Sequence, residues 1–131
     1  MRPSLTFWVL LAFVGFILYA LVTPRIGSDH GYARVRAAQA DIRDAFKPAL
    51  DRFEVDNGSF PKSLQDLVQQ PADAKNWRGP YFTATNLPVD PWGNPYIYEY
   101  PGKHNTNGYD LSSAGPDGKP GTDDDIVNWT R

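Results

Sequence analysis

Four carboxylates lie within nine residues near the end of the chain, in the segment 114–125, AGPDGKPGTDDD. They belong to Asp117, Asp123, Asp124 and Asp125. Carboxylates at this density repel one another unless solvent or a cation screens them. Calcium takes about six to eight hard oxygens, including backbone carbonyls that a glycine-rich loop can turn inward, although the spacing of an EF-hand is absent. The segment therefore indicates a calcium site or a solvated acidic turn, and the loop alone does not separate the two.

Short strands are predicted on both sides of this loop. Tyr96–Tyr100 alternates aromatic, aliphatic and charged residues in the way that is typical of a half-buried strand. Tyr109–Ser113 is predicted to be the returning strand of a hairpin whose loop is Pro101–Gly108, and 126–129 follows the acidic segment. The turn formers of 87–95, LPVDPWGNP, precede the hairpin, and we expect Trp92 to be buried there.

The hydrophobic pattern of residues 31–54 predicts one long amphipathic helix, Gly31 to Glu54. Apolar side chains recur at steps of three and four residues, and charged side chains occupy the other faces. Pro48 removes a backbone hydrogen bond inside this helix, so we expect a kink over 44–48. Gly58 is suited to a left-handed cap after it. The apolar stripe comprises Tyr32, Val35, Ala38, Ile42, Ala45, Phe46, Ala49 and Phe53.

A shorter helix is predicted over Pro61–Gln70. Ser63 and Asp66 have the spacing of a capping box, and Pro71 ends the pattern. The inward-facing side chains are predicted to be Leu64, Leu67 and Val68. Residues 72–86 carry no regular period, and Trp77 and Tyr81 are predicted to anchor them to the core.

The segment Leu5–Val22, LTFWVLLAFVGFILYALV, contains no charged residue and predicts a membrane-spanning helix. Its eighteen residues would span roughly 27 Å, close to the roughly 30 Å of a bilayer's hydrocarbon core. Trp8 and Tyr19 fit the membrane interfaces. A secretory signal peptide is the alternative, but 20–24, ALVTP, is a poor cleavage site, so we expect the segment to be retained.

The totals suit one membrane segment, residues 1–23, and one small domain, residues 24–131, in a chain of 131 residues with a formal net charge of −2. No basic patch is large enough for nucleic acid. The chain has no cysteine, which excludes disulfides, thiolate zinc sites and a cysteine nucleophile. Its two histidines, His30 and His104, are predicted to be surface residues, so the chain is predicted not to be an enzyme.

A series of short blocks makes the chain resemble a known family. In order they are 56–61 DNGSFP, 76–77 NW, 79–81 GPY, 87–88 LP, 90–96 DPWGNPY, 101–104 PGKH, 109–111 YDL, 113–118 SAGPDG, 124–126 DDI and 128–129 NW. Their order and spacing resemble the major pseudopilin of type II secretion systems, within the type IV pilin superfamily. The resemblance covers about residues 24 to 131.

The resemblance implies an α+β, pilin-like fold. A long N-terminal helix, half transmembrane and half amphipathic, would pack on a small antiparallel sheet, with a calcium loop at the C-terminal end. Carried over by position, Asp117, Asp124 and Asp125 would supply carboxylates to calcium, Ala114 and Lys119 would supply carbonyls, and Asp123 would face solvent. The aromatic residues are expected to pack in the core and turns rather than bind sugar, with Phe82 and Tyr98 as exposed exceptions. The packed set is Trp77, Tyr81, Trp92, Tyr96, Tyr100 and Trp129.

The implied function is a structural subunit of a pseudopilus that polymerises through its apolar helix and aids protein export. Its expected partners are further copies in a filament, other pseudopilins and inner-membrane components of the secretion system. The charges of Arg2 against Arg25, Arg34 and Arg36 lean slightly toward a cytoplasmic head. Millimolar calcium occurs outside the cytoplasm, which favours a single-pass inner-membrane protein with a periplasmic head.

The N-terminus departs from the family's pattern. Members carry a short basic leader, a Gly–Phe cleavage point and a glutamate at the fifth mature position, whereas Arg2, Pro3 and Phe7 stand near those three places. The alternative is therefore an uncleaved, membrane-anchored scaffold or interaction module that does not polymerise.

Overall fold

The described part of the computed structural model comprises residues 29–83 and 86–130. The chain divides into two compact units, Met1–Gly31 and Tyr32–Arg131, and the second contains the sheet and the core. The predicted membrane segment, Leu5–Val22, and the predicted boundary after residue 23 lie outside the described residues. Within the described ranges, no helix has the length and apolar character needed to cross a membrane.

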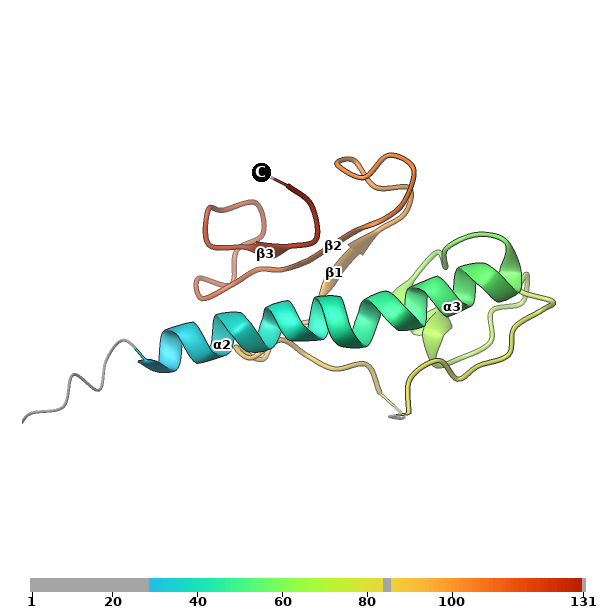
Figure 1. Cartoon of the computed structure of the whole chain (residues 1–131), viewed down its shortest axis with the longest axis horizontal. Coiled ribbons are helices and arrows are strands. Elements are labelled where there is room, and N and C mark those ends of the chain that lie inside the picture. Colours follow the sequence, from blue (N-terminus) through green and yellow to red (C-terminus); the bar gives the residue numbers. More distant parts are fainter. Residues whose placement is uncertain (1–28, 84–85, 131) are drawn as a thin grey trace, which may run out of the picture. The chain divides into compact units, whose positions relative to one another are not determined.

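A long helical segment and a three-stranded antiparallel sheet make up the second unit (Figure 1). The sheet has the order β1-β2-β3, with Tyr98 opposite Leu111 and Ser113 opposite Ile126. The predicted α+β class is confirmed. In chain order the elements are α2 (Asp29–Ala40), the π-helix η1 (Asp41–Phe46), α3 (Lys47–Asn57), the 3-10 helix η2 (Leu64–Leu67), β1 (Ile97–Glu99), β2 (Asp110–Ser113) and β3 (Ile126–Val127).

The predicted long helix is confirmed as the continuous run α2, η1 and α3. Pro48 stands in the first turn of α3, and the π-helix immediately before it accommodates the missing N–H by a wider turn. In place of the kink expected over 44–48, the structure has this π-helix, and Figure 1 shows the ribbon continuing through it. The helix ends as predicted, with Gly58 at φ 82° and its N–H donating to the carbonyl of Glu54 at 2.7 Å.

The apolar stripe of the helix forms the centre of the core. Phe46 is fully buried, with its ring centroid 4.9 Å from that of Tyr96 and 5.1 Å from that of Phe82. Burial of each such side chain stabilises the fold by about 1.5–3 kcal/mol. Tyr32, near the start of α2, departs from the prediction, because it is 69% exposed. The buried members of the stripe are Ala38, Ile42, Phe46, Ala49 and Phe53.

The second predicted helix is shorter than expected. The capping box of Ser63 and Asp66 is confirmed, but only the four residues of η2 are helical. The carbonyl of Leu67 accepts the N–H of Tyr81 at 2.7 Å, which ties the irregular segment after η2 to the last residue of η2. Trp77 donates its indole N–H to the carbonyl of Asp66 at 2.8 Å, which confirms that it anchors residues 72–86.

Three side chains are placed differently from their predictions. Tyr98 is half-buried and its hydroxyl donates to the carbonyl of Pro61 at 2.8 Å, because the segment before η2 covers it. Phe82 is likewise half-buried against the core, so neither residue is the exposed exception that was expected. Trp92, predicted to be buried, is half-buried and packs on the core from its turn.

Candidate metal centre

The acidic loop closes between the ends of two paired strands. Ser113, the last residue of β2, pairs with Ile126, the first residue of β3, so the ends of the segment 114–125 lie side by side. Gly115 has φ 62°, and a Cβ on it would collide with the backbone oxygen of Asp124. The two arms of the loop therefore touch at a position that only glycine permits.

A buried carboxylate from another turn supports the start of this loop. Asp90 is 2% exposed, and one of its oxygens accepts the hydroxyl of Ser113 at 2.6 Å. The same hydroxyl accepts the N–H of Gly115 at 3.1 Å. The other oxygen of Asp90 accepts the N–H groups of Trp92 and Asn94 at 3.0 and 2.8 Å, which ties the 87–95 turn to the loop.

Three of the oxygens predicted to hold calcium surround one hydroxyl. The Oγ1 of Thr122 lies 3.0 Å from the carbonyl oxygen of Lys119, 2.5 Å from Oδ1 of Asp124 and 3.3 Å from Oδ1 of Asp125. A hydroxyl has one hydrogen and donates to one acceptor at a time. The sequence prediction did not include Thr122, although a hydroxyl residue between a glycine and three aspartates is a detectable signal.

The remaining predicted ligands lie around this cluster. The N–H of Asp117 donates to Oδ2 of Asp124 at 3.0 Å, and Oδ1 of Asp117 accepts the N–H of Lys119 at 2.8 Å. Ala114 is buried at the start of the loop, and Asp123 is exposed, as predicted. Within residues 29–83 and 86–130, no three acidic, histidine or cysteine side chains are grouped so that they could hold a metal. Any ion in this loop would therefore also depend on backbone oxygens.

The hard oxygens of the loop are of the chemical kind that calcium prefers. Two carboxylates and one carbonyl lie around the hydroxyl oxygen of Thr122. The carboxylate of Asp117 instead accepts the backbone N–H of Lys119. The contact of Gly115 with Asp124 holds the two arms of the loop close together. The residues present match calcium in donor chemistry, while the described carboxylates do not form a group of three around one point.

A second buried carboxylate, on β2, organises the neighbouring hairpin loop. Asp110 is 6% exposed and accepts the backbone N–H groups of Lys103, His104 and Asn105, each at 2.9 Å. The ring Nδ1 of His104 lies 2.9 Å from the same carboxylate, and the ring stacks on Trp129 with centroids 4.2 Å apart. Burial by itself would raise the pKa of Asp110, but these hydrogen bonds outweigh it and hold the pKa below its usual value. His104 is exposed, as predicted, and its ring also takes part in this structural cluster.

Comparison with known proteins decides the family. The model of a family described as type II secretion system, protein G, matches residues 25–129. The chain belongs to this protein G family. The resemblance seen in the sequence blocks is therefore confirmed. The family consists of structural pseudopilins, so the prediction that the chain is not an enzyme is also confirmed.

Relatives of known function extend the match over most of the chain. The type II secretion system core protein G of Escherichia coli K12 is 39% identical over 127 residues, covering 92% of this chain and 84% of the relative. The core protein G of Pseudomonas aeruginosa PAO1 is 44% identical over 123 residues, covering 86% and 83%. The crystal structure of the major pseudopilin from the type 2 secretion system of enterohaemorrhagic E. coli matches with a TM-score of 0.68 and 34% identity, covering 84% of this chain and 98% of that one. The pilin-like fold of this protein G family member is thus supported by both sequence and structure.

Proposed function

We propose that the chain is a pseudopilus subunit that polymerises through its apolar N-terminal segment and aids protein export. The observation that carries this proposal is the protein G family match over residues 25–129, joined to a fold shared with a major pseudopilin. The apolar segment Leu5–Val22 would hold the chain in the inner membrane, with the head in the periplasm. Other pseudopilins and inner-membrane components of the secretion system are its proposed partners.

The second candidate function is an uncleaved, membrane-anchored interaction module that does not polymerise. The residues that favour it are Arg2, Pro3 and Phe7, which stand near the leader glycine, the first mature phenylalanine and the glutamate of the family pattern. Both candidates share the same head and differ in the processing of the N-terminus.

Overproduction of the full chain with the other components of a type II secretion system tests the first candidate. We expect fibres on electron micrographs that an antibody against this chain labels. Mass spectrometry of the membrane-extracted protein should show a processed start. An intact Met1 together with an absence of labelled fibres would instead identify the anchored module.

We also propose that the acidic loop binds one calcium ion. The carboxylates of Asp117, Asp124 and Asp125 would hold it together with the carbonyls of Ala114 and Lys119. The support is the convergence of the Lys119 carbonyl and two of these carboxylates on the Thr122 hydroxyl, in a loop closed by Gly115. When bound, the ion would supply the positive charge that allows several carboxylates to occupy so small a loop.

Thermal unfolding with calcium and with a chelator tests the ion. At free calcium a hundredfold above the dissociation constant, binding to the folded state should raise the free energy of unfolding by about 2.7 kcal/mol. The Asp124→Ala variant should lose this calcium-dependent shift. Asp73→Ala removes an exposed carboxylate that pairs with Lys62 and should keep the full shift. If the unsubstituted protein has the same melting temperature with calcium and with the chelator, the result would count against the site.

A further inference from the structure

A groove of about 470 Å³ lies between the long helix and the C-terminal segment. Its apolar lining includes Ile42 from the helix and Tyr109, Val127 and Trp129 from the sheet side. Its charged lining is Arg43 and Lys47, and the described residues that line it include no carboxylate. The groove therefore combines an apolar floor with positive charge, which suits an acidic segment that also offers apolar atoms.

Both cations of the groove can exchange their present partners at little cost. The side chain of Arg43 is 75% exposed and pairs with Asp44, while that of Lys47 is 58% exposed and pairs with Asp51. Ion pairs this exposed contribute little to stability because solvent and salt screen them. A carboxylate brought into the groove by another molecule would meet two available positive groups.

The acidic loop of the same chain has the complementary chemistry. Residues 116–125 carry four aspartates and one lysine, a formal charge of −3, and two exposed prolines, Pro116 and Pro120. If Asp117, Asp124 and Asp125 hold calcium, the formal charge becomes −1, and Asp123 remains outside the predicted ligands. The prolines match the apolar floor of the groove, and Asp123 matches its cations.

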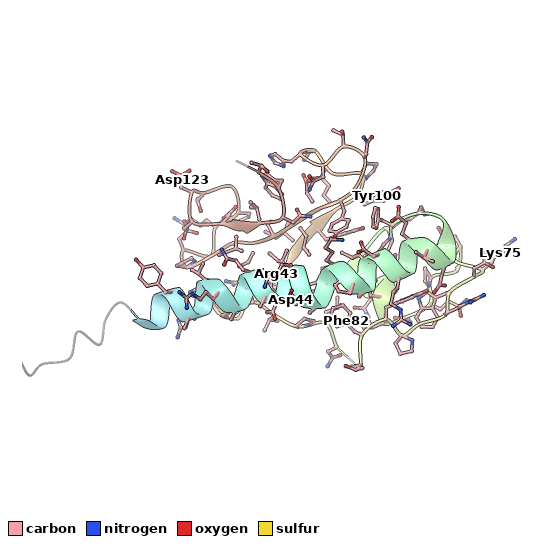
Figure 2. The ribbon with its side chains drawn as sticks, viewed as in Figure 1. Arg43, Asp44, Lys75, Phe82, Tyr100 and Asp123 are labelled. Atoms are coloured by element: carbon pink, nitrogen blue, oxygen red, sulfur yellow. The ribbon has the colours of Figure 1, made fainter. Side chains whose placement is uncertain are left out.

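The loop of one molecule is not placed to enter its own groove. Its ends are paired at Ser113 and Ile126, and Gly115 is held against Asp124, so the segment is a closed loop rather than a free arm. Figure 2 shows Asp123 at the outer part of this loop, pointing away from the long helix that carries Arg43. The two complementary surfaces lie on different parts of one molecule, so they can contact two different neighbours.

We propose that the groove receives the acidic loop of a second copy of this chain, with Asp123 facing Arg43 and Lys47. The contact joins two different surfaces, so repetition builds an open filament unless the rotation closes a ring. This inference rests on the proposed pseudopilus function and names the head surfaces that would meet in the fibre. It adds a polar, orientation-setting contact to association through the apolar segment.

Disulfide cross-linking tests the contact cleanly because the chain has no cysteine. The full chain carrying Arg43→Cys and Asp123→Cys should give disulfide-linked dimers and longer ladders in oxidised fibres, on gels run without reductant. The matched control pairs Asp123→Cys with Lys75→Cys and should stay monomeric. Lys75 is an exposed residue of the irregular segment after η2, which Figure 2 shows near the C-terminal end of the long helix, far from Asp123. A disulfide within one chain, or equal dimer in both pairs, would overturn the inference.

Fibre formation distinguishes a failure of this head contact from a failure of the proposed pseudopilus function. Labelled fibres of the Arg43→Cys, Asp123→Cys chain without ladders would overturn the head contact and leave the pseudopilus proposal standing. An unsubstituted chain that forms no fibres would overturn both.

Charge exchange provides an independent readout. The double variant Arg43→Glu, Lys47→Glu should lose fibres while keeping the melting temperature of its head, and adding Asp123→Lys should restore them. Unchanged fibres in the double variant, or no recovery in the triple variant with an intact head, would contradict the contact.

Discussion

Substitution of Asp110 by alanine is expected to lower the free energy of unfolding by about 4 kcal/mol, since it removes a buried carboxylate and leaves several part-buried N–H groups without their acceptor. The carboxylate accepts three successive backbone N–H groups, from Lys103 to Asn105, and contacts the ring of His104. Typical domains are stable by only about 5–15 kcal/mol, so this loss is a large fraction of the total free energy of unfolding. Urea denaturation followed by circular dichroism measures the loss.

The same carboxylate gives the loss a pH dependence. The pKa of Asp110 in the folded protein lies below its usual value of 3.8, so the folded state binds its proton less readily than the unfolded state. Its contribution to stability is therefore fully present above pH 3.8 and is lost as the pH falls through the folded-state pKa. The difference between the unsubstituted protein and Asp110→Ala should be constant at neutral pH and shrink in acid.

Asp44→Ala is the matched control for this effect. Asp44 is an exposed aspartate on the long helix, paired with its neighbour Arg43, and its replacement should leave the unfolding curve almost unchanged. Equal losses in the two variants would mean that the buried hydrogen bonds of Asp110 do not hold the hairpin loop. Such a result would also remove the reason for the predicted acid dependence.

Features that depend on neighbouring residues could be predicted from the sequence. The long helix, its glycine cap at Gly58 and the capping box of Ser63 follow from hydrophobic period and local hydrogen bonding. The strand Ile97–Glu99 lies within the predicted alternating segment, and its partner follows after the predicted loop. These elements are confirmed because local patterns and the core favour the same conformation.

Features that depend on distant partners could not be predicted in the same way. Tyr98 was expected to be exposed, but the segment at Pro61, thirty-seven residues earlier, covers it and accepts its hydroxyl. Asp90 looked like a turn former, and its contact with Ser113 across twenty-three residues is visible only in the fold. The contact of the Leu67 carbonyl with the N–H of Tyr81, fourteen residues later, is likewise visible only in the fold.

The acidic loop shows the same division. The density of aspartates left a calcium site and a solvated acidic turn both open, and the resemblance to pseudopilins implied the individual ligands. Neither indicated that Thr122 gathers three of the oxygens, or that Asp90 supports the loop through Ser113. Both depend on the three-dimensional closure of the loop, whose tightest point is Gly115.

Replacement of Gly115 by alanine is therefore expected to be the most damaging single-methyl change in the loop. The residue has φ 62°, a region that costs an alanine about 1–2 kcal/mol. Its new Cβ would also collide with the backbone oxygen of Asp124, so the two arms would have to separate. Strain and overpacking together should lower the free energy of unfolding by about 3 kcal/mol, as measured by urea denaturation. The calcium-dependent rise in melting temperature should fall as well, because separated arms cannot contribute oxygens to one ion.

Gly121→Ala isolates the cause of this loss. Gly121 lies in the same loop at φ 88°, and a Cβ there would meet nothing within 4 Å, so this variant has the backbone strain without the collision. It should lose about 1–2 kcal/mol and keep its response to calcium. If the two variants lose equal stability and both keep the calcium shift, contact between the arms at Gly115 does not set the geometry of the ion site. If only Gly115→Ala loses the shift, the closure of the loop, rather than its charge alone, is what allows calcium to bind.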